Sequence, residues 1–268
     1  MKIISYSDIH LEFPKGLAVP EGADADLMIL SGDVVNMRKP DPLAHFLEAW
    51  QKPVLFVPGN HEYYTERPMG TENDLFRKWL GDHLPNVTLL VDEAVSFQCV
   101  NFFGGTMWTD YAGGDETAMS EAQKCMPDYE LIRTNDNRRL TPEDTIKLHD
   151  IFKERLIAWL EADLKGPRVV ITHHAPVRHP DSIYAGSVMT PAFNSLDMTE
   201  VIGKYQPDFW FYGHTHECDR QNVGRTQIIS NQLGYEGRNG YYECTGKFSA
   251  EGLPVLIAQE TGQSGGSK

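Results

Sequence analysis

Several features are scarce or absent in this chain of 268 residues. No apolar run approaches the roughly 20 residues that a membrane-spanning helix needs, so we expect no membrane partner. The opening residues 1–6 become polar too soon for a signal peptide, which favours a cytoplasmic protein. The four cysteines, Cys99, Cys125, Cys218 and Cys244, form no C-x-x-C pair. Reduced thiols are therefore expected, and we find no internal repeat.

Positive charge is also in short supply. The chain has 24 Lys and Arg residues against 38 Asp and Glu residues, a formal net charge of −14. Such a charge disfavours nucleic acids and anionic membranes as partners, because both attract basic surfaces. No basic stripe with interleaved aromatic residues is present either, so a nuclease is the weaker alternative. Bound divalent cations could still create a local positive site.

What the chain does have is a repeated arrangement in which a strand-like apolar run ends in polar, metal-binding residue types. The five clusters are Asp8 and His10, Asp33, Asn60 and His61, His173 and His174, and His214 and His216. Taken singly, the cluster at Asp8 is equally compatible with an ordinary turn, and Asp33 fits an ordinary turn better than a ligand site. Their repetition at five strand ends is the stronger signal, because ligands gather at the carboxyl ends of strands in α/β sheets.

The elements between these clusters predict an α/β fold with parallel strands. We expect helices over 41–51 and 71–83 and a long helix from Thr141 to just before Gly166. Short strands over 87–91, 94–98 and 100–103 suggest an antiparallel stretch, and strands over 226–230 and 255–258 follow later. We predict one domain over residues 1–260, with a partly helical surface insertion at about 110–140, and a flexible tail over 261–268.

Imidazole and carboxylate groups without thiolate suit first-row transition metals. The candidate ligands number more than the four that one tetrahedral site uses, so two metals account for them better. A carboxylate has two oxygens and can bridge two cations. A paired site polarises a phosphoryl group and lowers the pKa of a bridging water, which yields hydroxide near neutral pH.

The five clusters resemble the motifs of the calcineurin-like metallophosphoesterases. The matching residues are Asp8-x-His10, Gly32-Asp33, Gly59-Asn60-His61-Glu62, His173 and Gly213-His214-x-His216, in order and across most of the chain. The resemblance implies a four-layer α/β/β/α sandwich of two mixed sheets flanked by helices, with a dinuclear metal site at the strand carboxyl ends. It also implies hydrolysis of a phosphate ester by attack of a metal-bridging hydroxide.

The same resemblance implies a role for each motif residue. One metal would be held by Asp8, His10 and His216, the other by Asn60, His173 and His214, and Asp33 would bridge the two. His61 would contact the phosphate and protonate the leaving oxygen, so His61 and Asp33 are the expected catalytic residues. The expected substrate-binding residues are Asn60, His61 and His174. His173 is the expected ligand of its pair because it directly follows the strand, and His174 then supports it or contacts substrate. Glu62 is expected to be structural.

Two departures from the family's protein phosphatases bear on the substrate. Asn36 stands where those enzymes carry an Asp that pairs with the catalytic His, and Pro58 stands where they carry an Arg. A phosphoprotein phosphatase is therefore disfavoured, and the chain looks more like bacterial small-molecule phosphodiesterases. We expect a small phosphodiester or phosphomonoester substrate, with the diester preferred. Pocket walls are expected from 108–140 and 176–196, where Trp108 could line the rim or be buried.

The expected cofactors are two divalent transition-metal ions. Manganese is the expected metal, and Fe, Zn, Ni and Co also suit nitrogen and oxygen ligands. A catalytically silent scaffold with the same fold is the alternative to an enzyme, although none of the motif ligands is missing. The oligomeric state is left open by the sequence.

Overall fold

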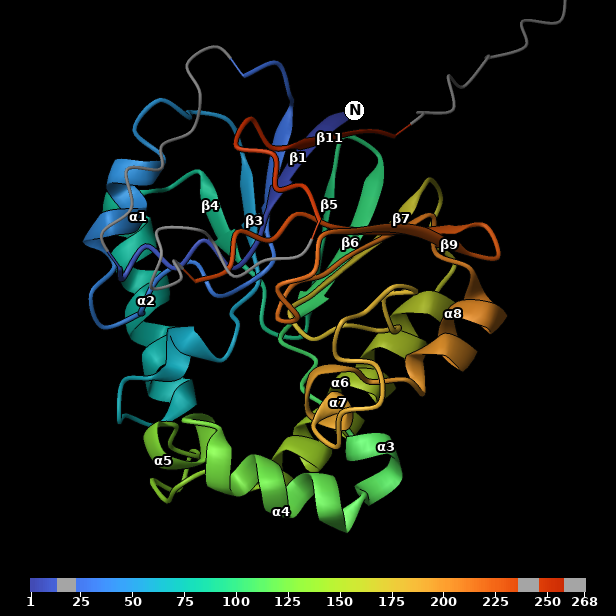
Figure 1. Ribbon diagram of the computed structural model, residues 1–268. Coiled ribbons are helices and arrows are strands. Elements are labelled where there is room, and N and C mark those ends of the chain that lie inside the picture. Colours follow the sequence, from blue (N-terminus) through green and yellow to red (C-terminus); the bar gives the residue numbers. More distant parts are fainter. Residues whose placement is uncertain (14–22, 236–245, 258–268) are drawn as a thin grey trace, which may run out of the picture.

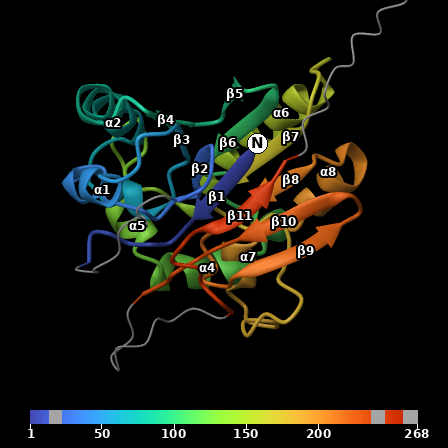
Figure 2. The ribbon, with the colours of Figure 1, turned by 90° about the horizontal axis from the view of Figure 1, so that it is seen from above.

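The computed structural model describes residues 1–13, 23–235 and 246–257 of the chain. Among these residues, a pair of mixed β-sheets face each other (Figures 1 and 2). The first sheet has the order β11 (Leu253–Leu256), β1 (Lys2–Tyr6), β2 (Leu27–Leu30), β3 (Val54–Phe56) and β4 (Val87–Leu89). The second has the order β5 (Glu93–Phe97), β6 (Val100–Gly105), β7 (Arg168–Thr172), β8 (Phe209–Phe211), β10 (Thr226–Ser230) and β9 (Asp219–Val223).

Helices cover the outer face of each sheet (Figure 1). Helices α1 (Asp41–Phe46) and α2 (Met69–His83) share a core layer with the first sheet. Helices α6 (Pro142–Glu161) and α8 (Met198–Tyr205) share another with the second sheet. A capping box between Thr141 and Asp144 begins α6, as the sequence predicts. None of the helices in the described ranges combines the length and apolar character needed to cross a bilayer.

Side chains alternate between the core layers along each strand. In β2, Leu27 and Ile29 face the second sheet, whereas Met28 and Leu30 face the helices on the outside. Burial on both faces explains why the sequence shows continuous apolar runs instead of an apolar–polar alternation. The predicted four-layer α/β/β/α fold class is confirmed.

The parallel strands of the two sheets bring their carboxyl ends together. Strands β1, β2 and β3 run parallel in one sheet, and β6, β7, β8 and β10 run parallel in the other. The sheets are tied together at this edge, because Nδ1 of His173 lies 2.9 Å from the carbonyl oxygen of Ser31. Both oxygens of Asp8 likewise accept the backbone N–H of His214 at 3.0 Å. The polar turns that follow the strands therefore form one cluster.

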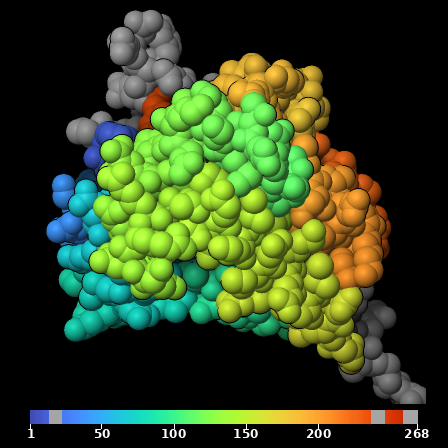
Figure 3. Space-filling model, turned by 90° about the horizontal axis from the view of Figure 1, so that it is seen from below, coloured from blue at the N-terminus to red at the C-terminus, as the bar shows by residue number. Residues whose placement is uncertain are grey.

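Short helices lie below this edge. They are α3 (Tyr111–Gly114), α4 (Glu116–Cys125), α5 (Asp128–Leu131) and α7 (Thr190–Phe193). Figure 3 shows the first three, in green, spread over the lower face of the molecule. This segment is anchored in the core, because Ala118 and Ala122 are fully buried.

Several local predictions differ from the structure. Helix α6 ends at Glu161, short of the expected end just before Gly166, because Ala162 is already extended. Helix α1 ends at Phe46, five residues earlier than expected, because Leu47 already leaves helical geometry. Strand β4 pairs parallel to β3 in the first sheet, so the expected antiparallel stretch is limited to β5 and β6. Strand β9 was not expected, because it is largely polar. Trp108 is buried, and the predicted tail lies outside the described residues.

Candidate metal centre

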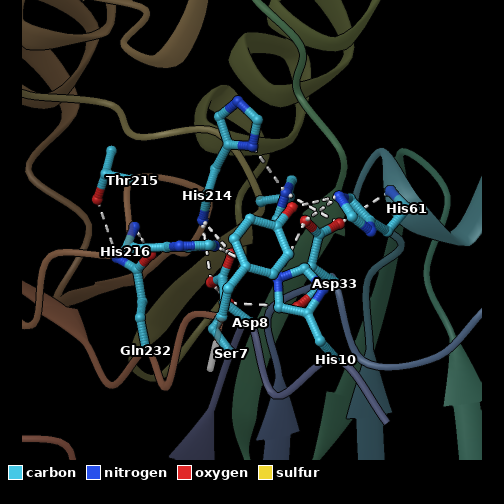
Figure 4. Close-up of polar contacts among 12 residues, drawn as sticks. Ser7, Asp8, His10, Asp33, His61, His214, Thr215, His216 and Gln232 are labelled. Atoms are coloured by element: carbon cyan, nitrogen blue, oxygen red, sulfur yellow. Dashed lines mark hydrogen bonds and ion pairs between the residues drawn. The ribbon is translucent and has the colours of Figure 1, made fainter. Parts of the chain in front are cut away.

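Side chains from five strand ends converge on one point. The side chains form three groups, and within each group the potential ligand atoms lie within 4.8 Å of one another. The groups are Asp8, His10 and His216; His10, Asp33 and His61; and Asp33, His173 and His214. Figure 4 shows six of these side chains gathered in one cluster: Asp8, His10, Asp33, His61, His214 and His216. Asp33 belongs to two of the groups, which is the arrangement that a bridging carboxylate requires. The spatial convergence expected from the sequence is therefore present.

The backbone is unusual at most of these positions. Five of the seven predicted ligands have positive φ: Asp8 (53°), His10 (43°), Asp33 (52°), His214 (73°) and His216 (52°). Residues other than glycine seldom adopt this left-handed conformation, and it persists only where the surrounding structure enforces it. Each turn leaves its strand sharply, so the ligand side chain points back over the end of the sheet.

Two motif glycines allow the turns to approach each other closely. A Cβ atom on Gly213 would overlap with Oγ of Ser7 and would lie 2.6 Å from Oδ2 of Asp8. A Cβ atom on Gly59 would overlap with Oδ1 of Asp33 and would lie 2.6 Å from the backbone nitrogen of the same residue. Any side chain at these positions would displace a ligand, which gives the Gly-Asn-His and Gly-His motifs a steric reason.

The contacts around His173 fit a bound cation. Its Nδ1 donates to the carbonyl oxygen of Ser31, so in the neutral ring Nε2 carries a lone pair. That lone pair faces Oδ1 of Asn60 at 3.0 Å and Oδ1 of Asp33 at 3.3 Å. It also faces Nδ1 of His214 at 3.1 Å. A proton on Nε2 would satisfy one acceptor at a time, whereas a cation would contact all of these atoms.

The second group fits a cation in the same way. Nδ1 of His10 lies 3.0 Å from Oε1 of Glu12, and its Nε2 lies 3.3 Å from Nε2 of His216. Nε2 of His216 in turn lies 3.5 Å from Oδ1 of Asp8. The donor set is nitrogen and carboxylate oxygen, which suits a divalent first-row transition metal. The residues of both groups therefore fit a pair of such ions.

The orientation of Asn60 is fixed by residues that the sequence did not single out. Its Nδ2 donates to Oδ1 of Asp128 at 2.9 Å and to the hydroxyl of Tyr64 at 3.0 Å. The amide oxygen consequently points to His173. Asp128 begins α5, within the segment interpreted as an insertion, and only the folded structure brings it to the site.

Glu62 is buried beneath the site and binds the backbone of two turns. Its two oxygens accept the N–H groups of Asp33 (2.8 Å), Val34 (2.7 Å), Val35 (3.0 Å) and Gly59 (2.6 Å). Burial raises the pKa of this carboxyl group to about 7, while the N–H donors act in the opposite direction. The expectation that Glu62 is structural agrees with these contacts.

The protonation of the histidines follows from burial and from the charge of Asp33. Burial lowers the pKa of His214 and of His174 well below the usual value. Burial also acts to lower the pKa of His173, but the charge of Asp33 raises it to about 10. Burial likewise acts to lower the pKa of His61, but Asp33 and Glu12 raise it to about 9. Asp33 is therefore the charge around which the site is organised.

His61 lies at the edge of the cluster. It begins a short 3-10 helix (His61–Tyr63) that follows strand β3. Its Nδ1 is 3.0 Å from Oε1 of Glu12, and its Nε2 is 2.7 Å from the hydroxyl of Tyr235. Burial acts to raise the pKa of Glu12, but hydrogen bonds from His10 and His61 lower it to about 2. Tyr235 also stacks on the ring of His10, with centroids 4.5 Å apart. Sequence reasoning missed both partners of His61; the signal for Glu12 is weak, since it only follows His10 by two residues.

His174 lies behind the cluster. Its ring packs against His214, with centroids 4.1 Å apart, and against Trp108 at 5.5 Å. It is buried and is not among the residues that line the cavity. A role in substrate binding therefore stays a prediction, and support of His214 is the role that these contacts favour.

A cavity of about 430 Å³ opens above the cluster. Asp33, Asn60, His61, His214 and His216 lie on one side of it. Two segments supply the walls, residues 125–128 and several positions within 182–194, as expected for the regions 108–140 and 176–196. Such a volume is typical of small-molecule sites.

Comparison with known proteins agrees with the fold and the cluster. The family model described as calcineurin-like phosphoesterase matches residues 1–218, so the chain belongs to this family.

Two relatives cover most of the chain. "Uncharacterized protein L509" of Acanthamoeba polyphaga mimivirus is 28% identical over 264 residues, covering 88% of this chain and 92% of that protein. "UPF0046 protein K07C11.7" of Caenorhabditis elegans is 26% identical over 228 residues, covering 81% of this chain and 64% of that protein.

A solved structure supports the fold. The phosphopantetheinyl hydrolase (PptH) of Mycobacterium tuberculosis aligns with a TM-score of 0.62 at 19% identity and covers 87% of this chain and 89% of that one. At this identity the likeness concerns the architecture alone.

Proposed function

We propose that the protein is a metal-dependent phosphoesterase that hydrolyses a small phosphate ester, with a phosphodiester as the preferred substrate. Two divalent transition-metal ions, of which manganese is the expected one, would be held by the residues that face one another in the cluster. When bound, the ions would polarise the phosphoryl group and supply a nucleophilic hydroxide near neutral pH. We also propose that the enzyme acts in the cytoplasm.

One observation carries this proposal. Nε2 of His173 faces Oδ1 of Asn60 at 3.0 Å and Oδ1 of Asp33 at 3.3 Å, deep in the protein, and Asp33 and Asn60 also line the cavity. Without a cation, Nε2 must carry a proton and the His173 ring a positive charge, as its raised pKa of about 10 indicates, whereas a cation would contact all of these buried atoms at once. A scaffold protein without a ligand to bind would have no need for such contacts.

Asp33 and His61 would have different roles in the hydrolysis. Asp33 would contact both ions, since its Oδ1 lies 3.3 Å from Nε2 of His173 and its Oδ2 lies 3.9 Å from Nε2 of His10. His61 would hold a proton on Nε2, toward the cavity, and would pass it to the oxygen of the leaving alcohol. Fixed donors and charges at the reacting centre are the largest source of catalysis in such sites.

The walls of the cavity favour a small ester over a macromolecule. Within the described ranges of the chain, no Lys or Arg lines the cavity, so nothing there would bind the additional phosphates of a nucleic acid. Met126, Met189 and Phe193 offer apolar contacts for the alcohol portion of a substrate. These features support a substrate with a single phosphate group and an uncharged substituent.

The test is turnover of bis(p-nitrophenyl) phosphate by the Mn²⁺-loaded protein, followed by a panel of natural phosphate esters that includes a phosphopantetheinyl ester. Asp33→Asn keeps the shape and the tolerance for positive φ, but it removes the bridging charge, so turnover should fall at least about 100-fold. Asp41→Asn removes an exposed carboxylate from α1 and serves as the matched control. Activity of Asp33→Asn within about threefold of wild type, at equal metal content, would rule out the mechanism.

A further inference from the structure

One carboxylate lies between two of the site histidines, and the family motifs do not assign it a role. Oε1 of Glu12 is 3.0 Å from Nδ1 of His10 and 3.0 Å from Nδ1 of His61. The two rings stand nearly perpendicular, with an interplanar angle of 68° and centroids 4.5 Å apart. The other oxygen of Glu12 is buried and accepts no hydrogen bond from the described residues. Among the described residues, the carboxylate of Glu12 therefore accepts hydrogen bonds only from the rings of His10 and His61.

Asn36, the position at which the protein phosphatases carry the partner of the catalytic histidine, is engaged elsewhere. Its Nδ2 donates to the carbonyl oxygen of Tyr64 at 2.9 Å, and its Oδ1 accepts the backbone N–H of Arg38 at 3.0 Å. Asn36 thus closes a local turn and leaves the orientation of His61 to another residue.

We infer that Glu12 is a positioning residue that fixes the ring tautomers of His10 and His61 through one shared oxygen atom. The inference rests on the proposed function. A carboxylate only accepts hydrogen bonds, so each Nδ1 must carry a proton. Nε2 of His10 is then left with a lone pair that faces the metal centre, 3.3 Å from Nε2 of His216. Nε2 of His61 faces the cavity instead, beside the hydroxyl of Tyr235 at 2.7 Å.

The shared oxygen links metal binding to proton donation. When the phosphorus–oxygen bond to the leaving alcohol breaks, the proton on Nε2 of His61 passes to the alcohol oxygen, and the Nδ1 proton stays on the ring in its bond to Glu12. Without the charge of Glu12, His61 can turn or carry its proton on the wrong nitrogen, and His10 loses the partner that directs its lone pair. Loss of such partners lowers metal affinity by about 10–100-fold in known sites.

The first test compares two esters that differ only in the leaving group, methyl p-nitrophenyl phosphate and methyl phenyl phosphate, at saturating Mn²⁺. Phenolate is the more basic leaving group and needs the proton more. Glu12→Met keeps the length of the side chain but removes the shared acceptor oxygen, which a glutamine would retain. It should lower kcat for methyl phenyl phosphate by at least about 30-fold and for the nitrophenyl ester by only a few fold, because general acids contribute about 10²–10⁴-fold. Glu72→Met, at a buried acid on α2 that touches no histidine, should leave the ratio of the two rates unchanged.

The second test does not depend on activity. Equilibrium dialysis against Mn²⁺ should show that Glu12→Met weakens one of two sites by about 10-fold or more, while Glu72→Met binds as wild type does. Glu12→Asp keeps the charge but is one methylene too short to reach both rings, so intermediate values are expected, and it replaces Glu12→Met if that variant does not fold.

The two readouts separate the possible failures. An unchanged leaving-group ratio in Glu12→Met overturns the contact with His61, and an unchanged Mn²⁺ affinity overturns the contact with His10. If the wild-type protein hydrolyses neither ester, the proposed function fails, while the Mn²⁺ affinity still decides whether Glu12 directs His10.

Discussion

The substitution Glu62→Gln tests how the turns of the site are held in place. Glu62 is fully buried and accepts four backbone N–H groups, which come from the turn after β2 and the turn after β3. A glutamine has the same shape, but it replaces one oxygen with an NH₂ group that cannot accept. Two backbone donors would then lose their acceptor in the protein interior.

The magnitude follows from the number of donors left without a partner. A buried donor that loses its acceptor costs about 1–3 kcal/mol, so the two together amount to about 2–6 kcal/mol. That is a large share of the roughly 5–15 kcal/mol by which folded proteins are stable. Glu72→Gln is the matched control, because this equally buried acid has one ion pair at 3.3 Å, to the partly exposed Arg67. Its substitution should cost less than about 1 kcal/mol.

The assay is urea denaturation of the metal-free proteins, monitored by circular dichroism. It is carried out at pH 8, where Glu62 is ionised. Metal is removed so that the change in the free energy of unfolding reports the hydrogen bonds and not metal binding. A loss smaller than about 1 kcal/mol for Glu62→Gln would refute the reasoning, because it would mean that the four N–H groups find other partners.

Three further predictions concern the site and the core. Gly213→Ala should lose Mn²⁺ binding in dialysis, because its Cβ atom would collide with Oγ of Ser7, and binding equal to wild type would contradict the steric argument. Burial acts to raise the pKa of Asp197, but hydrogen bonds from His149 and Lys153 lower it to about 2, so this group contributes stability above pH 4 that is lost as the pH falls toward 2. Asp197→Asn should therefore lower the free energy of unfolding by about 1–2 kcal/mol at pH 7 but hardly at pH 2, and an equal loss at both pH values would contradict the assignment. Removal of metal with EDTA should lower the Tm by several degrees, and Mn²⁺ should restore it in proportion to the logarithm of its concentration, whereas a Tm that ignores both would speak against a metal site.

The strands and their polar ends could be predicted from the sequence, because burial on both faces leaves continuous apolar runs that stop abruptly. The convergence of Asp33 with His173 and His214 follows from the same logic, since parallel strands end at one edge. Roles for these residues came from the resemblance to a family.

The remaining features depend on contacts that local sequence does not encode. Strand β4 is three residues long, and nothing in its composition says that it joins β3 instead of β5. Asp128 holds Asn60 across 68 positions of the chain, and Tyr235 meets His61 across 174. Glu12 is near His10 in sequence, but its contact with His61 is set by the packing of two turns.

The central claim is that two cations lie on either side of Asp33. Anomalous X-ray diffraction from crystals of the Mn²⁺-loaded protein tests it most directly. We expect two manganese peaks, one beside Asp8, His10 and His216 and the other beside Asn60, His173 and His214. A single peak, or peaks that do not both contact Asp33, would contradict it.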